Sequence, residues 1–365
     1  MDKKMYNFSA GPGALPDTVL QEAHRQLLNY QSSGLSILEM GHRTQLFEDI
    51  YAEARDLIRK LLKIPDTFEV LLLQGGATLQ FSMAPLNLAI EGKVVDVLHT
   101  GYWSRKAIAD IKRVSPVRIV ASSEDSGHCL IPKVSQDNFN PDAPYVYLTS
   151  NNTIYGTQWH TFPDTGNVPI VADMTSDIFS KPLDFSKFGV IFASAQKNVG
   201  IAGVTLVIVR RDLAERCPEH VGTLLQYRTH LNRNTVYNTA PVFGIYMMLL
   251  VLRWMKEKGG VEGLMKINAE KAKRVYAAVD RHEIYLSRVN PEDRSEMNAC
   301  FFIQGGLEQK FVEEALKRKI IGIKGHSEAG GIRVSLYNPV ALEAVDALEE
   351  LMEDFALCYS SFVVQ

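Results

Sequence analysis

The sequence has few of the features that mark a metal, disulfide, membrane or nucleic-acid protein. Its four cysteines are far apart and form no CxxC pair, which predicts neither a zinc site nor a disulfide framework; they are Cys129, Cys217, Cys300 and Cys358. The longest apolar run, IYMMLLVL, is too short to span a bilayer. A net charge of −3, with both signs scattered, gives no reason to expect nucleic acid or an anionic membrane as partner. Small molecules are therefore the expected ligands.

The start of the chain, MDKKMYNFSAGPG, also lacks the apolar core of a signal peptide. Together with the scattered cysteines, this predicts a cytoplasmic protein. The 365 residues are 46% hydrophobic and contain neither a repeat nor a low-complexity tract. Such a chain can bury a large core, and its length predicts two domains.

Short β-rich runs alternate with helical patterns between about residues 68 and 210, which is typical of a parallel sheet with crossover helices. The predicted strands are FEVLLLQ, VVDVLHT, VRIVASS, YVYLTSN, VPIVADM, FGVIFAS and VTLVIVR. Because these runs are almost continuously apolar, we expect an α/β fold whose seven-stranded, mostly parallel sheet is covered on both faces.

The pattern changes near Gly259–Gly260, after the predicted helix PVFGIYMMLLVLRWMKEKGG. A second helix follows within VEGLMKINAEKAKRVYAAVDRH, and then MNACFFIQ and GGIRVSLYN read as strands beside the helices EQKFVEEALKRK and ALEAVDALEELMEDFALCY. We therefore predict a large domain over residues 16–259 and a smaller α+β domain from residues 1–15 and 260–365.

Ligands of open α/β sheets bind at the carboxyl ends of the strands, so polar residues at those ends are the candidate site residues. In LLLQGGATLQF a strand enters a glycine turn and then a helix expected to start near Thr78. Free backbone N–H groups there would hold a phosphate, although a plain turn that needs glycine is an equal alternative. Neither GxGxxG nor GxxxxGK[ST] is present, which excludes the two common nucleotide motifs.

Three more side chains follow predicted strands: Asp173 after VPIVA, Lys197 in SAQKN and Trp103 in HTGYWSR. Taken singly, Asp173 reads best as a turn former, Lys197 as a lysine that reaches solvent, and Trp103 equally as core or as a stacking face. Taken together with the glycine turn, they supply what pyridoxal 5′-phosphate needs: a phosphate cradle, an aromatic face, an acidic partner for the ring nitrogen and a nucleophilic amine.

This order of residues resembles the fold-type I family of pyridoxal-phosphate enzymes. Longer motifs narrow the resemblance to the phosphoserine aminotransferase family of the class V aminotransferases; they are NFSAGPGALP, ILEMGHRT, LLLQGGATLQF, DMTSDIFSKPLDFSKFGVIFASAQKNVGIAGVTLVIVR, YNTAPVFGIYMM and GGIRVSLYN. The resemblance implies a Schiff base between Lys197 and the cofactor, and no metal. It also implies cofactor contacts from Ala77, Thr78, Trp103, Thr153, Asp173 and Gln196.

The resemblance further implies a homodimer with shared active sites, in which Asn238 and Thr239 reach the cofactor phosphate of the neighbouring subunit. His42 and Arg43 match residues near the far anionic group of the substrate. Arg333 lies on the polar face of the alternating strand IRVSLYN and suits the substrate α-carboxylate. His326 matches a further substrate residue.

The chain departs from the family next to His326. Where the family has an arginine that contacts the substrate phosphate across the dimer, this sequence has Ser327, followed by Glu328. Loss of such a contact costs about 1.5–3 kcal/mol if nothing replaces it. Lys324 is one candidate replacement, although a lysine lacks the bidentate fork of arginine.

The implied reaction is transamination between glutamate and 3-phosphohydroxypyruvate, which gives O-phosphoserine and 2-oxoglutarate in serine biosynthesis. The 4-phosphohydroxythreonine step of pyridoxal-phosphate synthesis is a second expected use. The alternatives are another class V aminotransferase, such as one specific for alanine or serine and glyoxylate, a cysteine desulfurase, or a protein that keeps the fold without catalysis.

Overall fold

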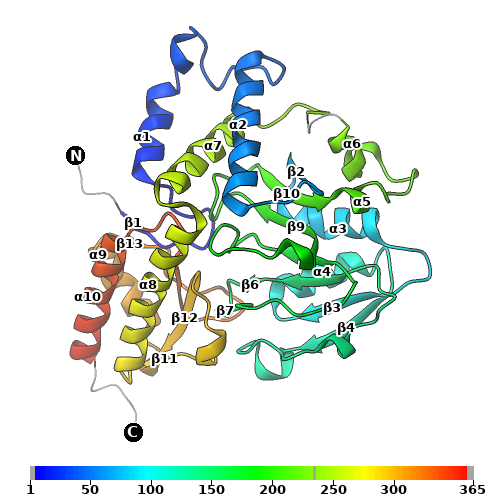
Figure 1. Ribbon diagram of the computed structural model, residues 1–365. Helices are drawn as coiled ribbons and strands as arrows, with labels where there is room; N and C mark the ends of the chain where they lie inside the picture. The colour runs from blue at the N-terminus through cyan, green and yellow to red at the C-terminus, as the bar shows by residue number, and fades with distance from the viewer. Residues whose placement is uncertain (1–4, 233–235, 360–365) are drawn as a thin grey trace.

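A seven-stranded sheet forms the centre of the molecule in the computed structural model, which describes residues 5–232 and 236–359 (Figure 1). From one edge to the other its strands are β2 (Phe68–Leu73), β10 (Thr205–Arg210), β9 (Phe188–Ser194), β8 (Ile170–Asp173), β5 (Val146–Thr149), β3 (Val95–His99) and β4 (Val117–Ser122). Each of the predicted strands is present, so the α/β prediction is confirmed.

The sheet is parallel except at β10, which runs antiparallel to both of its neighbours, β2 and β9. The pairs β3–β4, β3–β5, β5–β8 and β8–β9 are all parallel. The carboxyl ends of β5, β8 and β9 therefore lie side by side, and Thr149, Asp173 and Ser194 end these strands along one edge of the sheet.

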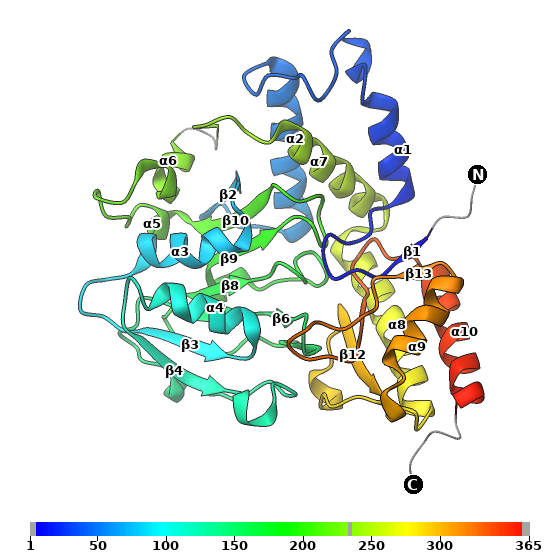
Figure 2. The same cartoon turned by 180° about the vertical axis from the view of Figure 1, so that it is seen from behind.

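Helices cover both faces of the sheet, and alternate residues of each strand supply the two interfaces. Val70 and Leu72 of β2 belong to the core that includes α2 (Gln45–Leu62) and α7 (Val242–Glu257). Leu71 and Leu73 belong to the core on the opposite face, with α3 (Gly76–Leu88) and α4 (Tyr102–Ile111) (Figure 2). This two-sided burial is what the continuous apolar runs predict.

The edge strand β4 is the exception, because much of it is exposed and Ile119 keeps 47% of its surface. β4 lies at an edge of the sheet and pairs only with β3, and, unlike the buried edge strand β2, it is not covered along its length by packed elements. The expectation of cover on both faces is therefore wrong for this strand.

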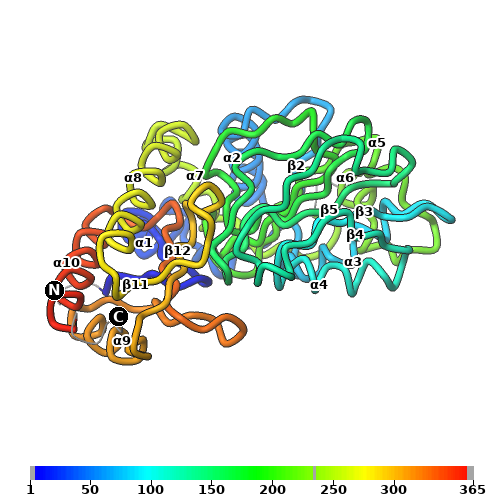
Figure 3. The backbone as a smooth tube through the Cα atoms, turned by 90° about the horizontal axis from the view of Figure 1, so that it is seen from below, coloured from blue at the N-terminus to red at the C-terminus, as the bar shows by residue number. Residues whose placement is uncertain are grey.

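The chain after α7 forms a second group of elements: α8 (Gly260–Arg281), α9 (Glu308–Lys317), α10 (Leu342–Tyr359) and a sheet of β11 (Tyr285–Leu286), β12 (Asn298–Ile303) and β14 (Ile332–Ser335). The N-terminal strand β1 (Tyr6–Asn7) pairs in parallel with β13 (Ile320–Ile321). Figure 3 shows α8, α9, α10, β11 and β12 together at one side of the large sheet. Phe8 is fully buried in the apolar core of this group. The boundaries of the two predicted domains stay a prediction.

The remaining elements are short or peripheral. They are α1 (Asp17–Gln26), α5 (Arg211–Ala214), α6 (Tyr227–Leu231), the hairpin β6 (Asn151–Asn152) and β7 (Thr157–Gln158), and 3-10 turns at Tyr30–Ser32, Glu124–Ser126, Gln136–Asn138, Phe185–Lys187, Thr223–Leu225, Pro291–Asp293 and Gln304–Gly306. Among the described residues, no helix combines the length and the apolar character that crossing a bilayer requires.

Candidate active site

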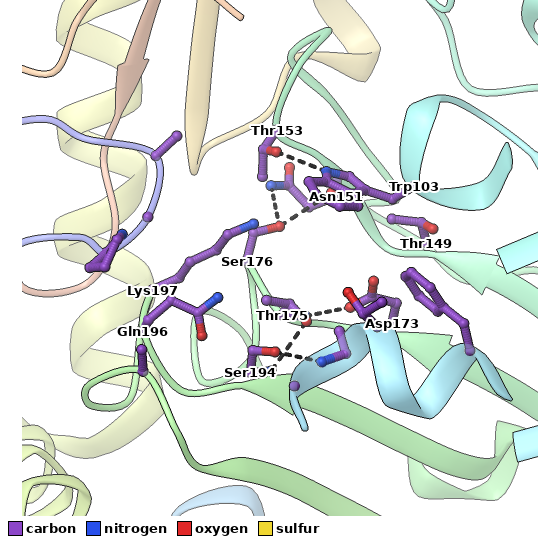
Figure 4. A pocket seen from close by; sticks show the side chains of 18 of the residues that line it. Trp103, Thr149, Asn151, Thr153, Asp173, Thr175, Ser176, Ser194, Gln196 and Lys197 are labelled. Carbon is purple, nitrogen blue, oxygen red and sulfur yellow. Dashed lines mark hydrogen bonds between the residues drawn. The ribbon is translucent and has the colours of Figure 1, made fainter. Parts of the chain in front are cut away.

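A cavity of about 480 Å³ opens where β5, β8 and β9 end (Figure 4). Nine of the residues named from sequence line it: Ala77, Thr78, Trp103, Thr153, Asp173, Gln196, Lys197, His326 and Arg333. They come from distant parts of the chain, and the sheet and β14 bring them together. Their roles are argued below from their surroundings.

Lys197 extends from the turn after β9 into this cavity (Figure 4). Its Nζ lies 5.7 Å from the centre of the Trp103 ring. Burial of the ammonium lowers the pKa of Lys197 to about 8, and the Coulomb effects of Asp173 and Arg333 oppose each other there. A fraction of the side chain is therefore a neutral amine near pH 7, and the neutral form is the nucleophile and the base.

Asp173 closes β8 and is 5% exposed, on the floor of the cavity. Burial raises the pKa of its carboxyl, while hydrogen bonds from Thr175 oppose that shift; the Thr175 backbone N–H donates to Oδ1 at 3.0 Å. A carboxylate so enclosed favours a cationic partner nearby. An N–H⁺ group of a ring above the cavity floor is such a partner.

The glycine turn after β2 leads straight into α3, which begins at Gly76 rather than near Thr78. Gly75 and Gly76 both have positive φ, and a Cβ on Gly75 would approach Leu79 Cδ2 to 2.4 Å. The turn therefore requires glycine, and it points the first N–H groups of α3 toward the cavity.

Two of the first N–H groups of α3 already donate to side chains, whereas the sequence predicted free N–H groups that would hold a phosphate. The Ala77 N–H donates to Ser194 Oγ at 2.6 Å, and the Gly76 N–H donates to Thr205 Oγ1 at 2.8 Å. Because the Ser194 hydroxyl can itself donate, Ser194 joins Thr78 and Gln196 among the groups that can hold an anion at this helix end.

Trp103 is the second residue of α4, and its indole Nε1–H donates to Thr153 Oγ1 at 3.3 Å. The Thr153 carbonyl accepts from Arg333 Nη1 at 3.3 Å. Arg333 Nε is buried with no hydrogen-bond partner among the described residues. Arg333 lines the cavity from the polar face of β14, so the cavity holds a guanidinium.

His326 lines the cavity from the loop between β13 and β14. Burial lowers the pKa of its imidazole, and the charge of Arg333 lowers it further. His326 is therefore mostly neutral at pH 7, and Arg333 is the permanent cation of this wall.

Several lining residues had no predicted role. Asn151 and Ser176 form a buried polar pair, in which Asn151 Nδ2 donates to Ser176 Oγ at 2.8 Å. The segment Ala10–Pro12 covers Lys197, and the Tyr337 hydroxyl donates to the Ala10 carbonyl at 2.7 Å. Asn151 is the last residue of the predicted strand YVYLTSN, and that position was a usable signal. Nothing in the sequence places Ala10–Pro12 over the lysine.

The other predicted site residues lie outside this cavity. His42 and Arg43 line a separate pocket with Val236 and Tyr237. Asn238 borders a small pocket beside Gln74, and the Thr239 carbonyl accepts from Gln74 Nε2 at 2.8 Å. One chain therefore does not bring these residues together with Lys197.

Comparison with known proteins places this geometry in a family. The model of the class-V aminotransferases matches residues 5–348. The chain belongs to the class-V aminotransferases. A phosphoserine aminotransferase of Lysinibacillus sphaericus (strain C3-41) is 47% identical over 357 residues, which is 97% of this chain and 99% of that protein.

Solved class-V structures agree with the fold. The phosphoserine aminotransferase from Bacillus circulans subsp. alkalophilus has a TM-score of 0.95 at 43% identity and covers 97% of this chain and 99% of its own. The pyridoxal-phosphate-bound phosphoserine aminotransferase from Trichomonas vaginalis has a TM-score of 0.91 at 39% identity, covering 96% and 100%. The fold-type I aminotransferase fold is thereby confirmed.

Class-V aminotransferases depend on pyridoxal 5′-phosphate, and the cavity fits that cofactor. It offers an amine at Lys197, a buried carboxylate at Asp173, an indole face at Trp103 and donors at the start of α3. The enclosed carboxylate and the lysine with a lowered pKa are independent observations that both match the demands of this group.

Proposed function

We propose that the chain transfers the amino group of glutamate to 3-phosphohydroxypyruvate and so produces O-phosphoserine and 2-oxoglutarate for serine biosynthesis. One observation carries the chemistry: the Lys197 amine faces the Trp103 ring in a cavity that also contains Asp173 and Arg333. Relatives that are 43–47% identical over nearly the whole chain and are named phosphoserine aminotransferases support the substrate assignment.

Bound pyridoxal phosphate supplies an aldehyde that takes up the amino group and a ring that accepts electrons as the α-proton leaves. Lys197 holds the cofactor and then, as a free amine, moves a proton from the substrate α-carbon. A pKa of about 8 suits a base that must gain and lose a proton near neutral pH.

Asp173 and Trp103 prepare the ring for this task. The Asp173 carboxylate keeps a proton on the ring nitrogen, because its enclosure makes an adjacent positive charge favourable. Trp103 provides a flat surface for the ring, and its hydrogen bond to Thr153 fixes the orientation of the indole.

Arg333 binds the substrate α-carboxylate. Its Nη1 donates to the Thr153 carbonyl, which orients the guanidinium in the cavity wall. Both glutamate and O-phosphoserine carry this carboxylate and a second anionic group at the far end, so each serves in turn at one site.

We further propose a homodimer with shared sites, in the cytoplasm. The observation behind it is that His42, Arg43, Asn238 and Thr239 lie away from the cavity of their own chain. His42 and Arg43 instead line a pocket of their own, which leaves them available to a ligand held elsewhere. A second copy would bring these residues to the far end of the substrate, and 4-phosphohydroxythreonine is expected to fit the same place.

A cysteine desulfurase is not favoured. Cys300, which lies beside the cavity, pairs with Arg333 across β12 and β14. Burial raises the pKa of its thiol to about 12, so it is not a nucleophilic thiolate near pH 7.

The proposed function is tested by adding O-phosphoserine, glutamate, serine and alanine separately to cofactor-loaded protein and following the visible absorbance of the cofactor. We expect O-phosphoserine and glutamate to remove the visible absorbance band that the cofactor-loaded protein shows before any addition. Serine and alanine should not remove it at the same concentrations. If serine or alanine removes it and O-phosphoserine does not, the cofactor assignment stands and the phosphoserine assignment falls.

A further inference from the structure

The cavity has little permanent positive charge for a substrate with a phosphate. Among the described residues that line it, the basic side chains are Lys197, Arg333 and His326. Lys197 serves the cofactor, Arg333 suits the α-carboxylate, and His326 is mostly neutral because its pKa is lowered. The neighbouring turn has Ser327 and the negative Glu328 where the family has an arginine, and Lys324, two residues before His326, does not line the cavity. Even with Arg43 of a second copy at the far end of the substrate, as proposed above, the phosphate is one cation short.

Arg105 is placed beside this wall. It lies on α4, one turn from the Trp103 end of the helix, and its guanidinium carbon is 5.3 Å from the centre of the Tyr102 ring. The same Tyr102 ring lies 5.6 Å from the His326 ring. A single aromatic side chain therefore separates Arg105 from a residue that lines the cavity.

Glu328 holds Arg105 in that place. Arg105 Nη2 donates to Glu328 Oε1 at 2.5 Å, and their side chains keep 49% and 33% of their surface exposed. Exposed ion pairs of this kind contribute little to stability and exchange partners readily. Arg105 is thus a cation whose present partner a dianion can displace.

The turn that carries Glu328 is firmly built. The Glu328 N–H donates to His326 Nδ1 at 3.1 Å, and the Gly330 N–H donates to the His326 carbonyl at 2.7 Å. The Gly325 N–H donates to the Gly331 carbonyl at 2.9 Å, and a Cβ on Gly325 would clash with the Gly330 carbonyl oxygen at 1.9 Å. His326 and Glu328 consequently keep a fixed relation, whereas the long arginine side chain can move.

We propose that Arg105 is a specificity residue that binds the substrate phosphate in addition to Arg43 of a second copy, and that Glu328 is the carboxylate from which the phosphate takes it. The proposal rests on the proposed function, because it assumes a phosphorylated substrate in this cavity. It explains how a chain with Ser327 at the turn recognises a dianion. The guanidinium is that of Arg105, on helix α4, and Glu328 of the turn positions it.

A purely structural ion pair predicts something different. If Arg105 and Glu328 only hold the turn against α4, removal of either partner loosens the same contact and weakens the binding of every amino acid alike. If Arg105 binds phosphate, removal of Arg105 weakens only phosphorylated ligands, and removal of Glu328 frees the cation.

The test is the second-order rate constant with which O-phosphoserine and L-serine, which differ only in the phosphate, each remove the visible absorbance band of the cofactor-loaded protein. For Arg105→Ala we expect the preference for O-phosphoserine over serine to fall about 10- to 100-fold, the range of one charge-assisted hydrogen bond. For Glu328→Ala we expect that preference to stay or to rise. Arg113→Ala, at a side chain 80% exposed on the segment after α4, is the control for loss of one positive charge.

Failure of the Arg105 proposal and failure of the proposed function give different results. Equal losses for both ligands in Arg105→Ala and Glu328→Ala overturn the proposal in favour of a structural ion pair, and an unchanged preference in Arg105→Ala overturns it as well. If the unaltered protein itself shows no preference for O-phosphoserine, it is the proposed function that fails.

Discussion

Asp173 is a side chain whose charge conflicts with its surroundings. Burial raises the pKa of its carboxyl above the ordinary 3.8, so the folded protein resists ionisation that the unfolded chain undergoes freely. The contribution of Asp173 to the stability of the cofactor-free protein therefore decreases as the pH rises from that ordinary value to the raised pKa of the folded state. A group kept at such a cost is expected to act on a ligand rather than on the fold.

We predict that Asp173→Asn separates function from stability. Transamination should fall by about 100- to 1,000-fold, as for loss of one preorganised electrostatic contact, because an amide does not hold a proton on the ring nitrogen. The melting temperature of the cofactor-free protein should stay the same or rise, because the buried charge is gone. A variant that keeps its turnover would remove Asp173 from the mechanism.

Single residues were predictable from sequence where chemistry follows directly from position. Asp173, Lys197 and Trp103 stand just after strands, and the parallel sheet brings those ends together. Ala10–Pro12 was not assigned a role, because its contact with Lys197 depends on how β1 pairs with β13, far away in sequence. A local pattern carries no information on such a contact.

At the scale of elements, the turn from β2 into α3 depends on a glycine for two separable reasons. Gly75 has φ +88°, and its added Cβ would approach Leu79 Cδ2 to 2.4 Å. Gly92 has φ +76°, but its Cβ would meet nothing within 4 Å. The two positions share the backbone cost and differ in the clash.

We predict that Gly92→Ala destabilises the protein by about 1 kcal/mol, the cost of a left-handed non-glycine residue, and leaves cofactor affinity unchanged. Gly75→Ala should cost more and should also weaken cofactor binding, since relief of the clash shifts the start of α3. Urea unfolding and cofactor dissociation measure both effects. If Gly75→Ala loses no more stability than Gly92→Ala and keeps its cofactor affinity, the assignment of this turn as the phosphate cradle is contradicted.

A second element-scale feature is Lys271 of α8, which is fully buried and donates to the carbonyls of Leu336 and Tyr337 at 2.8 Å each. Burial lowers the pKa of this lysine to about 7. The unfolded lysine keeps its proton up to about pH 10.5, so the unfolded chain binds more protons between these two values. The destabilising contribution of Lys271 is therefore complete below pH 7 and diminishes as the pH rises.

We predict that the free energy of unfolding rises with pH between 7 and 9.5 with a contribution from Lys271 that approaches about 1.4 kcal/mol per pH unit. Lys271→Met should remove that part of the slope. Denaturant unfolding of both proteins across this range measures the difference. Identical slopes would show that the ammonium is better solvated than its burial indicates.

The sequence predicted most elements, because apolar periodicity and glycine turns are local signals. The seven strands of the large sheet and α7 to α10 match the predicted runs closely. No prediction covered α1 or α2, although Thr44 caps α2 by accepting from the Phe47 N–H at 3.3 Å, which is a signal visible in the sequence. The exposure of β4 was not predictable, because strand order decides which strand lies at the edge.

At the scale of the whole molecule, Lys197 lies in the cavity and Arg43 lies outside it. We therefore predict that two inactive variants, one at each position, restore activity when their subunits are mixed. If Arg43 serves the cavity of a second copy, a Lys197→Ala subunit paired with an Arg43→Ala subunit has one complete site. Random pairing then restores about one quarter of normal activity, because half of the dimers are mixed and each holds one intact site of two.

The matched control pairs Lys197→Ala with Asp173→Asn. Both residues line the same cavity of one chain, so no mixed dimer has a complete site and activity should not return. Activity in this control, or none with Arg43→Ala, would contradict shared sites. The sequence motifs around His42 and Asn238 do not say which chain's cavity these residues serve, because that depends on how subunits assemble.

The central claim is that one cavity, through Lys197, takes an amino group from an anionic amino acid and gives it to an anionic keto acid. Initial rates with glutamate and 3-phosphohydroxypyruvate varied together test it most directly. The account predicts parallel double-reciprocal lines, 2-oxoglutarate released from glutamate alone in an amount equal to the enzyme sites, and neither result in a folded Lys197→Ala protein. Intersecting lines with no release from glutamate alone, or full turnover by Lys197→Ala, would contradict it.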